Sequence, residues 1–407
     1  MIVSCLNNPR ARRRLGVALV SIAVAGCGTP REVVSRPDGP AGLVSLSLRG
    51  QFNIVAQTRY PDITGLLFGG ISSITAIAGG KELLGLSDDR RGSRVYRFAL
   101  SGTGPEFTVE TLEVIQLSAV PPSVGDLDPE GLVALPNGSL LVSSDGIGTE
   151  PRVPPVIVEF LRTGAFVREV PIPERFRPNP TGPQVKGVRT NTGFESLTLS
   201  ADGDHLFTAS EAALIQDGEM PTFEAGSPAR IVEFARDGNS FAPRREFVYM
   251  VEPTYRPSFT PGLAVNGLVE LVALEGGDFL ALERSFVQEA GAAKPRDMNR
   301  IRLFRVSLAG ATDVSKVESL KGAPGIVPVK KTLVLDLSDV PGLTPELAPS
   351  LDNFEGMAFV APLPDGRPAF IMVSDDNFNQ AQRTWFLQFA AGPPPAAVPS
   401  QQREVKR

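Results

Sequence analysis

Five related segments recur along this chain, and this repeat constrains the fold more than any other feature of the sequence. Each copy opens with a short apolar segment, passes through a turn that contains glycine, and ends in an apolar strand that closes on polar or acidic residues. The copies begin near Ile71, Glu130, Glu195, Glu270 and Glu355. A repeat that cannot bury its own apolar face must stack against its neighbours.

The segments that follow each copy alternate between apolar and polar residues, as β-strands do. Val156–Phe160, Arg230–Phe234 and Arg302–Val306 are examples. Turn sequences such as Asn137-Gly138 separate the strands, and no long stretch keeps a helical period. Four strands in each radially arranged repeat make a β-propeller. We therefore predict an all-β fold: a single β-propeller with five clear repeats and five or six blades.

Closure of this propeller is expected to come from pairing of the termini. Val44–Leu48 alternates like a strand and would pair with the last blade near Trp385–Phe389. Such pairing would remove the open sheet edges.

The N-terminal segment has the pattern of a lipoprotein export signal. Arginines at 10 and 12–14 precede an apolar run, Leu15–Ala25, which is too short to span a membrane. The run ends in Val24-Ala25-Gly26-Cys27, which indicates cleavage before Cys27 and lipid on its thiol; an ordinary signal peptide with a chance cysteine is the alternative. The predicted boundaries are a signal peptide at 1–26, a tether at 27–42, the propeller at 43–390 and a disordered tail at 391–407.

These features predict an exported cell-envelope lipoprotein, periplasmic or on the outer surface, that meets the membrane through its lipid anchor. The only other cysteine, Cys5, is lost with the signal, so the mature chain has no thiol for a disulfide. The net charge is −5 and no basic block is present, which argues against nucleic-acid binding. We expect a monomer.

Several kinds of catalytic site are excluded by the residues that the chain lacks. The only histidine, His205, follows a hairpin turn and is expected to be solvated on a blade rim. No G-x-S-x-G motif accompanies it, which argues against a Ser-His-Asp hydrolase. No Cys/His spacing suits zinc.

The recurring acids remain as candidates for chemistry. The innermost strand of a blade lines the central channel, so Glu130, Glu195, Glu270 and Glu355 would approach one another. A second acidic tier would comprise Asp88, Asp145, Glu211, Glu283, Asp375 and Asp376. Clustered carboxylates repel unless cations compensate. The compensating groups would be Arg90, Arg91, Lys186, Arg189 and Arg284, or a hard cation such as Ca²⁺. The alternative is that these acids cap blade turns.

Several motifs resemble a known family. Asn191–Leu197 is similar to its Gly-Phe-Glu segment, and Pro328–Leu337 to its basic strand before the last repeat. Asp352–Met357, Val373–Phe378 and Gln382–Leu387 resemble its closing signature. Over roughly Val44 to Phe389 the chain resembles the phytase-like family called "esterase-like activity of phytase". One mild departure is that the second repeat has Glu130-Gly131 where the third has Glu195-Ser196.

The resemblance implies a propeller that hydrolyses phosphate esters, phytate-like ones among them, or carboxylic esters. It also implies site positions at Glu195, Glu355, Asp375 and Asn377. Our first hypothesis is a metal-dependent ester hydrolase in which these four residues hold Ca²⁺ and Glu195 or Glu355 acts as general base.

In the same hypothesis Lys186, Arg189 and Arg284 would bind a small anionic or ester substrate. The second hypothesis is a non-catalytic cell-envelope propeller that binds a ligand or protein partner. The fold alone does not choose between the two.

Overall fold

The computed structural model describes residues 37–392, with gaps at 38, 44, 55–65, 123, 294, 342 and 344–350. The predicted signal peptide, Cys27 and the C-terminal residues 393–407 lie outside the described residues, as does most of the predicted tether. None of the helices in the described part is long and apolar enough to cross a membrane.

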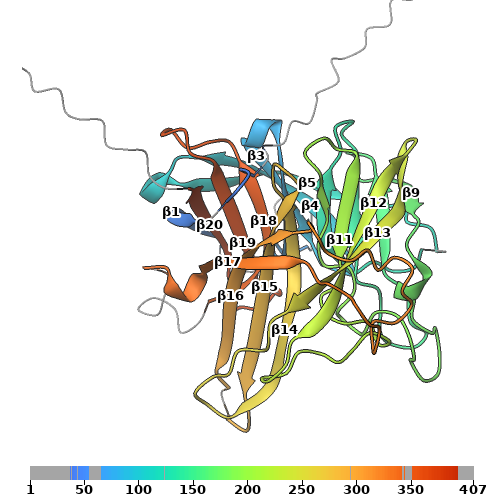
Figure 1. Ribbon diagram of the computed structural model, residues 1–407. Helices are drawn as coiled ribbons and strands as arrows, with labels where there is room; N and C mark the ends of the chain where they lie inside the picture. The colour runs from blue at the N-terminus through green and yellow to red at the C-terminus, as the bar shows by residue number, and fades with distance from the viewer. Residues whose placement is uncertain are drawn as a thin grey trace, which may run out of the picture. The chain divides into compact units, whose positions relative to one another are not determined.

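The described residues form five four-stranded antiparallel sheets, numbered here as blades 1 to 5 (Figure 1). Blade 1 contains β2 (Ile71–Ile77), β3 (Glu82–Ser87), β4 (Arg94–Ser101) and β5 (Thr108–Gln116), and blade 2 contains β6 (Pro129–Ala134), β7 (Leu140–Ser144), β8 (Val156–Phe160) and β9 (Phe166–Val170). Blade 3 contains β10 (Thr198–Leu199), β11 (His205–Ala209), β12 (Ser227–Asp237) and β13 (Ser240–Val251), and blade 4 contains β14 (Pro261–Ala273), β15 (Asp278–Glu289), β16 (Asp297–Ser307) and β17 (Lys330–Asp336). Blade 5 contains β18 (Asn353–Val360), β19 (Ala369–Asp375), β20 (Thr384–Ala391) and β1 (Leu46–Ile54).

Helical structure in the described part is confined to four single-turn 3₁₀ helices. They are η1 (Ala78–Gly80), η2 (Gly104–Glu106), η3 (Glu174–Phe176) and η4 (Leu337–Asp339). The prediction of an all-β propeller is confirmed. Of the two blade counts that the sequence left open, five is the one observed among the described residues.

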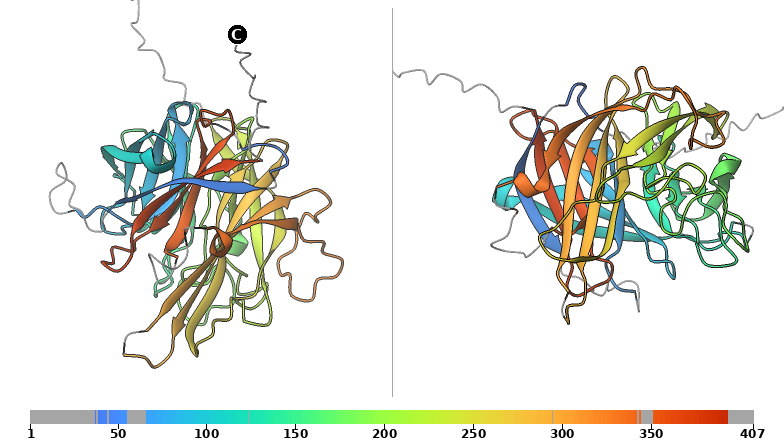
Figure 2. Two further views of the ribbon diagram at one scale, coloured as in Figure 1. Left: turned by 90° about the vertical axis from the view of Figure 1, so that its left-hand side faces the viewer. Right: turned by 60° about the horizontal axis from the view of Figure 1, so that its bottom comes forward.

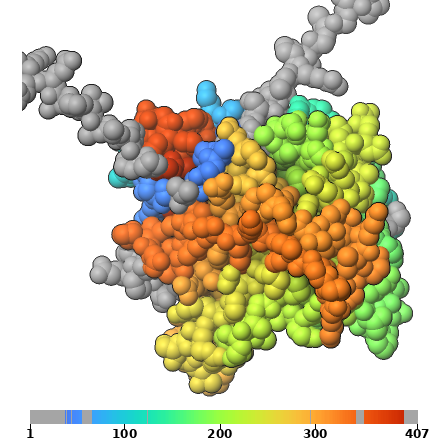
Figure 3. Space-filling model, in the orientation of Figure 1, coloured from blue at the N-terminus to red at the C-terminus, as the bar shows by residue number. Residues whose placement is uncertain are grey.

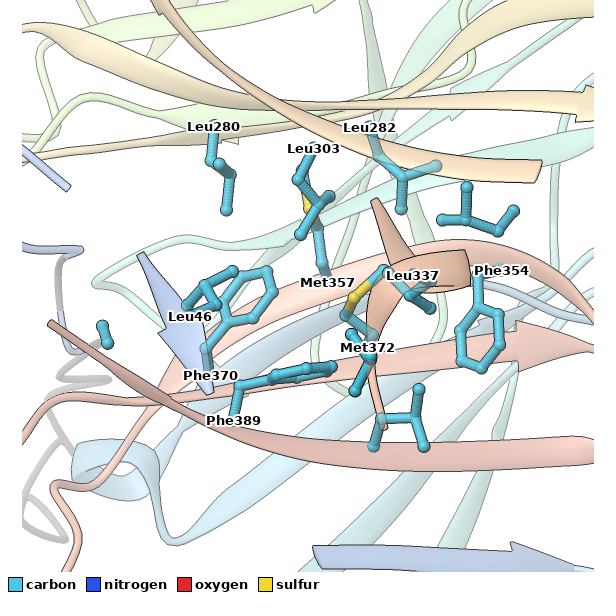
Figure 4. Close-up of a cluster of buried hydrophobic side chains, with 14 of the residues drawn as sticks. Leu46, Leu280, Leu282, Leu303, Leu337, Phe354, Met357, Phe370, Met372 and Phe389 are labelled. Carbon is cyan, nitrogen blue, oxygen red and sulfur yellow. The ribbon is translucent and has the colours of Figure 1, made fainter. Parts of the chain in front are cut away.

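Five hydrophobic clusters fill the spaces between neighbouring blades. They join blades 1 and 2, 2 and 3, 3 and 4, 4 and 5, and finally 5 and 1. Because the series returns to its starting blade, the five sheets form a ring. Figure 4 shows the cluster between blades 4 and 5, where Leu282 and Leu303 lie opposite Phe370 and Phe389. Burial of each such side chain contributes about 1.5–3 kcal/mol to the free energy of folding.

The termini of the propeller pair with each other, as the sequence predicts. Strand β1, from the N-terminal side, lies antiparallel to β20, with Leu48 opposite Phe389 and Phe52 opposite Phe386. Figure 2 shows this blue strand beside the red strands of blade 5. Blade 5 therefore takes three strands from the C-terminal part of the chain and its fourth, β1, from the N-terminal part, and this closes the ring.

The segment between β16 and β17 crosses from blade 4 onto blade 3, seen in Figure 3 as orange over green and yellow. Arg230 of β12 is fully buried and donates to the carbonyl oxygen of Val317 in this segment at 2.9 Å. The same guanidinium is paired with Asp217 at 2.6 Å and Glu246 at 2.8 Å. A satisfied buried charge therefore ties blade 4 to blade 3 in addition to their apolar contact.

Candidate active site

Acidic residues of different blades gather at one end of the strands. In blades 2 and 5 the innermost strand carries a glutamate near its start, Glu130 in β6 and Glu355 in β18. The neighbouring strand runs antiparallel and ends near a second acid: Asn353 at the start of β18 lies opposite Asp375 at the end of β19. In antiparallel neighbours, the start of one strand lies beside the end of the next, at the same end of the sheet. The repeat therefore brings both acids of a blade to the same end of the ring.

The innermost strands are bulged at these glutamates. In β18 the register shifts between Phe354 and Gly356, which makes Glu355 the extra residue. In β6 it shifts between Pro129 and Leu132, around Glu130. A bulge breaks the alternation of a strand and redirects a side chain, and bulges are frequent beside active sites. Innermost strands β2 and β14 have similar shifts, so the bulge belongs to the repeat, and in β6 and β18 it places a glutamate at the pocket described next.

A pocket of about 400 Å³ lies at this end of the strands, and we call it the acidic pocket. It is lined by Asp88, Asp89, Arg90, Arg91, Asp128, Glu130, Asn191, Glu195, Arg284, Glu355, Asp375, Asn377 and Phe378. Seven carboxyl groups thus face three guanidinium groups. This imbalance requires that some of the carboxyl groups hold protons or that a cation from outside the chain compensates them.

Arg284 of β15 is the main positive charge inside the pocket. Its guanidinium donates to Glu355 Oε1 at 2.7 Å, to Glu211 Oε1 at 3.3 Å and to the side-chain oxygen of Asn353. Asn353 in turn donates to Glu355 Oε1 at 2.9 Å and to Asp375 Oδ2 at 3.4 Å. Burial raises the pKa of Glu355, and Arg284 and Asn353 oppose that rise. The pKa of Glu355 is raised overall, but Arg284 and Asn353 support its ionised form with hydrogen bonds, which the ionised form of Glu195, described next, lacks.

Glu195 has a different environment in the same pocket. It is 8 % exposed, and its carboxyl group accepts no hydrogen bond from any described residue. Burial raises its pKa well above the usual range, and the carboxylates of Asp145, Glu211 and Glu355 add to the rise. The protonated form of Glu195 is therefore favoured.

Two further acids of the pocket share this condition. Burial raises the pKa of Glu130 well above its usual range, and the carboxylate of Glu195 adds to the rise. Burial also raises the pKa of Asp88 to about 8, with Glu355 adding to it. The Asp88 Oδ1 atom is buried and without a hydrogen-bond partner. Burial is the main cause of these raised pKa values, and the neighbouring carboxylates add to it, so the protonated forms are favoured.

Other acids at this end of the ring are paired. Asp128 is 3 % exposed and accepts two hydrogen bonds from the guanidinium of Arg90, the first at 2.6 Å. Asp145 accepts a hydrogen bond from the backbone nitrogen of Gly193. A Cβ atom at Gly193 would lie 2.4 Å from the carbonyl oxygen of Asp145, so only glycine fits there. The glycine of the Gly-Phe-Glu segment thus lets blade 3 approach blade 2 closely.

The backbone around the pocket holds unusual conformations. Asn191, Asn377 and Phe378 line the pocket and have φ values of 57°, 46° and 50°. Among the described residues, only five other than glycine have positive φ, so three of them meet here. Such conformations are disfavoured for residues with a side chain, phenylalanine most of all among the three, and they cluster at functional sites. The two loops that carry them are therefore held in place by the surrounding structure.

The structure brings five of the predicted site residues together: Glu195, Glu355, Asp375, Asn377 and Arg284 all line the acidic pocket.

Lys186 and Arg189 are not among the residues that line it. Lys186 pairs with Glu174 at 3.0 Å, and Arg189 donates to the carbonyl oxygens of Ala213 and Gly218. Both side chains therefore form contacts with the surrounding loops and do not line the pocket.

Five of the predicted acids are absent from the pocket lining: Asp145, Glu211, Glu270, Glu283 and Asp376. Glu270 is 2 % exposed and accepts a hydrogen bond from Ser73 Oγ of blade 1 at 2.9 Å, so it joins two innermost strands. Glu283 is fully buried and accepts from Tyr249 at 2.8 Å and Lys331 at 2.6 Å.

Asp128 and Asn353, which contact the charged groups of the site, were absent from the sequence-based candidates. Each stands two positions before a glutamate of an innermost strand, Glu130 and Glu355. The other two repeats that carry a glutamate have Gly193 and Leu268 at this spacing, so no recurring pattern marked it in the sequence.

The sequence profile described as "Phytase-like: Esterase-like activity of phytase" matches residues 66–378, well over half of the chain. The chain belongs to this phytase-like family. The match covers blades 1 to 4 and the strands β18 and β19 of blade 5, and it includes every residue that lines the acidic pocket. No curated protein matches the sequence.

Solved structures similar to this phytase-like chain were also found. An α-L-arabinofuranosidase of Podospora anserina, solved with cellotriose, has a TM-score of 0.39 at 10 % identity, covering 86 % of this chain and 99 % of that one. The catalytic domain of an α-L-arabinofuranosidase of Coprinopsis cinerea gives 0.41 at 9 % identity, covering 86 % and 98 %. The WD40 domain of Toxoplasma gondii coronin gives 0.32 at 7 % identity, covering 89 % and 90 %. At these scores the likenesses say nothing about activity.

The fit of this phytase-like pocket to a metal ion is mixed. Its carboxyl and amide oxygens are the ligand types that Ca²⁺ takes, and Asp88 Oδ1 is a buried acceptor without a donor. However, the described residues contain no group of three or more His, Cys, Asp or Glu side chains arranged to hold a metal ion. An amide nitrogen of Asn353 also contacts two of the four predicted ligands, Glu355 and Asp375. Calcium binding at these residues therefore stays a prediction.

Proposed function

We propose that this chain hydrolyses esters in the acidic pocket, with Glu195 and Glu355 as an acid–base pair. The observation that carries the proposal is their contrast within one pocket. Glu355 is held by Arg284 and Asn353, whereas Glu195 has no donor among the described residues. Two carboxyl groups whose environments push their pKa values apart are suited to opposite roles in catalysis.

The roles follow from the surroundings of each group, since the charged form of Glu355 is supported by Arg284 and Asn353 and that of Glu195 by no hydrogen-bond donor. The carboxylate of Glu355 takes a proton from the attacking water, which adds to the carbonyl or phosphoryl centre of the ester. The protonated carboxyl of Glu195 gives its proton to the leaving alcohol oxygen. The products are an acid and an alcohol, and proton exchange with solvent restores both glutamates. No step of this scheme passes through a metal ion.

The charge of the pocket bears on the substrate. Arg90 is engaged by Asp128, and Arg284 by Glu355 and Glu211, so few positive groups remain for an anion. A polyanion such as phytate would meet repulsion from the remaining carboxylates unless a cation came with it. We therefore propose that uncharged carboxylic esters are hydrolysed better than phosphate esters when no divalent cation is added. Calcium, if it binds, would shift this preference toward phosphate esters.

The test is a comparison of p-nitrophenyl butyrate, p-nitrophenyl phosphate and phytate as substrates of the purified chain, with chelator and with added Ca²⁺. We expect butyrate hydrolysis in chelator, with kcat reduced by about 10²-fold or more in both Glu195→Gln and Glu355→Gln. Glu275→Gln is the matched control, because Glu275 is an exposed glutamate in the β14–β15 turn.

Two results would contradict the proposal: no hydrolysis of any of the three substrates under any of these conditions, or full activity in both pocket variants. The absence of hydrolysis would favour the non-catalytic binding hypothesis instead.

A further inference from the structure

A second cavity, of about 460 Å³, lies between blades 3 and 4, and we call it the blade 3–4 cavity. Its lining includes His205, the first residue of β11, and Ala273, the last residue of the innermost strand β14. The acidic pocket gathers the opposite ends of the corresponding strands: Glu355 lies near the start of innermost strand β18 and Asp88 just after the end of β3. The two cavities therefore open on opposite ends of the ring. The volume of the blade 3–4 cavity is in the range of sites that bind small molecules.

One wall of the blade 3–4 cavity carries more positive than negative charge. Glu233 is 1 % exposed, and its carboxylate is shared by three groups. Arg245 donates to it at 2.5 Å, His205 Nδ1 lies 2.9 Å from it, and Arg244 lies 3.6 Å from it. One carboxylate thus faces two guanidinium groups and an imidazole. A positive charge is left over at this wall.

The donors of this wall are not used up by the protein. Arg244 makes no hydrogen bond with any described residue, and neither does the Nε2 atom of His205. The other two acids of the cavity also accept hydrogen bonds from the protein, and those to Asp202 lower its pKa and keep it negatively charged near His205. Asp278 accepts two hydrogen bonds from Arg305, at 2.8 Å and 2.5 Å, and Asp202 accepts from Ser200 and from a backbone nitrogen. An anion from outside the chain would therefore find free donors.

The other wall is apolar. Phe207 and Phe279 meet edge to face with their ring centroids 4.7 Å apart, and Leu308 lies beside them on the segment that crosses from blade 4. Leu274 of the β14–β15 turn completes this side. A ligand that fills the cavity would thus have an apolar body and one charged end.

We propose that the blade 3–4 cavity binds a small amphiphilic carboxylate, with its head on Arg244 and His205 and its apolar body on Phe207, Leu274 and Leu308. The planar fork of an arginine matches the two oxygens of a carboxylate. The site is separate from the acidic pocket and does not depend on ester hydrolysis. His205, the only histidine of the chain, was expected to be solvated; its Nδ1 atom is instead buried against Glu233, and the proposal gives it a role in ligand binding.

The proposal is tested by calorimetric titration of the purified chain with octanoate, with 1-octanol as the uncharged analogue. We expect one saturable octanoate site and binding of 1-octanol at least about tenfold weaker. Arg244→Gln should weaken octanoate binding by about tenfold or more, because a hydrogen bond to a charged group is lost. Since the Arg244 side chain is 52 % exposed, this variant should keep the fold, which circular dichroism checks.

Arg91→Gln is the matched control, an exposed arginine of the acidic pocket, and should bind octanoate as the parent chain does. Glu195→Gln should also bind it normally, which separates this proposal from the proposed hydrolysis. No saturable binding at millimolar octanoate, or unchanged affinity in folded Arg244→Gln, would overturn the proposal.

Discussion

The protons held by the acidic pocket should make the protein less stable as the pH rises. Burial raises the pKa of Asp88 from its ordinary 3.8 to about 8 in the folded chain. A raised carboxyl pKa contributes stability that is present below the unfolded pKa and is lost as pH rises toward the folded one. Between pH 5 and pH 7 the folded state holds a proton on Asp88 that the unfolded state has released. The loss is about 1.4 kcal/mol per pH unit, or about 2.7 kcal/mol over this window.

Asp88→Asn isolates this contribution, since asparagine resembles the protonated acid and does not titrate. Urea unfolding at pH 5, 6 and 7 gives the free energy of unfolding. Trp385, the only tryptophan, is 4 % exposed in blade 5 and reports the transition by fluorescence. We expect stability to fall with pH in the parent chain, and to fall by about 2.7 kcal/mol less in the variant. The pKa values of Glu130, Glu195 and Asp375 are raised as well. In both proteins, therefore, part of the fall in the free energy of unfolding with pH should remain.

A stability that rises from pH 5 to pH 7 would refute this reasoning, and so would identical slopes in the two proteins. Glu275→Gln, at an exposed turn, should leave the slope unchanged.

Three further predictions concern other parts of the chain. Arg284→Gln should reduce the free energy of unfolding by about 3–5 kcal/mol at pH 7 in urea titrations, because it leaves Glu211 and Glu355 buried without their cation; an unchanged stability would contradict that role. Calcium at 100 times its Kd should stabilise the fold by about 2.7 kcal/mol, and chelator should reverse the rise in Tm; a Tm insensitive to both would reject calcium binding at Glu195, Glu355, Asp375 and Asn377. Cys27→Ser should release the chain from the membrane fraction, and mass spectrometry should find acyl chains on Cys27 in the parent; an unmodified Cys27 would rule out the lipid anchor.

The ring itself could be predicted from the sequence because its causes are local and repeated. Alternation of apolar residues specifies strands, and each copy of the repeat is one blade that must pack on its neighbours. The pairing of β1 with β20 followed from the same pattern at Val44–Leu48, since a closed ring leaves no edge. The choice between five and six blades was left open because the later repeats are longer. That extra length is found in the long strands of blade 4 and in the segment between β16 and β17.

The convergence of the acids could also be anticipated, but not which cations meet them. Arg284 reaches Glu355 because β15 lies next to an innermost strand, with Arg284 opposite Gly267, where a Cβ atom would collide with Glu211. Lys186 was as good a candidate as Arg284 in the sequence, yet in the structure it pairs with Glu174. Such choices depend on loop paths and on β-bulges, which have no periodic pattern in the sequence.

The central claim is that Glu195 and Glu355 act together as acid and base on an ester. Its most direct test is the kcat of the purified chain for p-nitrophenyl butyrate in chelator, measured for the parent, Glu195→Gln, Glu355→Gln and the double variant. If the two groups act as one unit, each single variant loses about 10²-fold or more and the double variant loses little beyond that. Activity that survives in both single variants, or losses that simply multiply in the double variant, would contradict the paired mechanism.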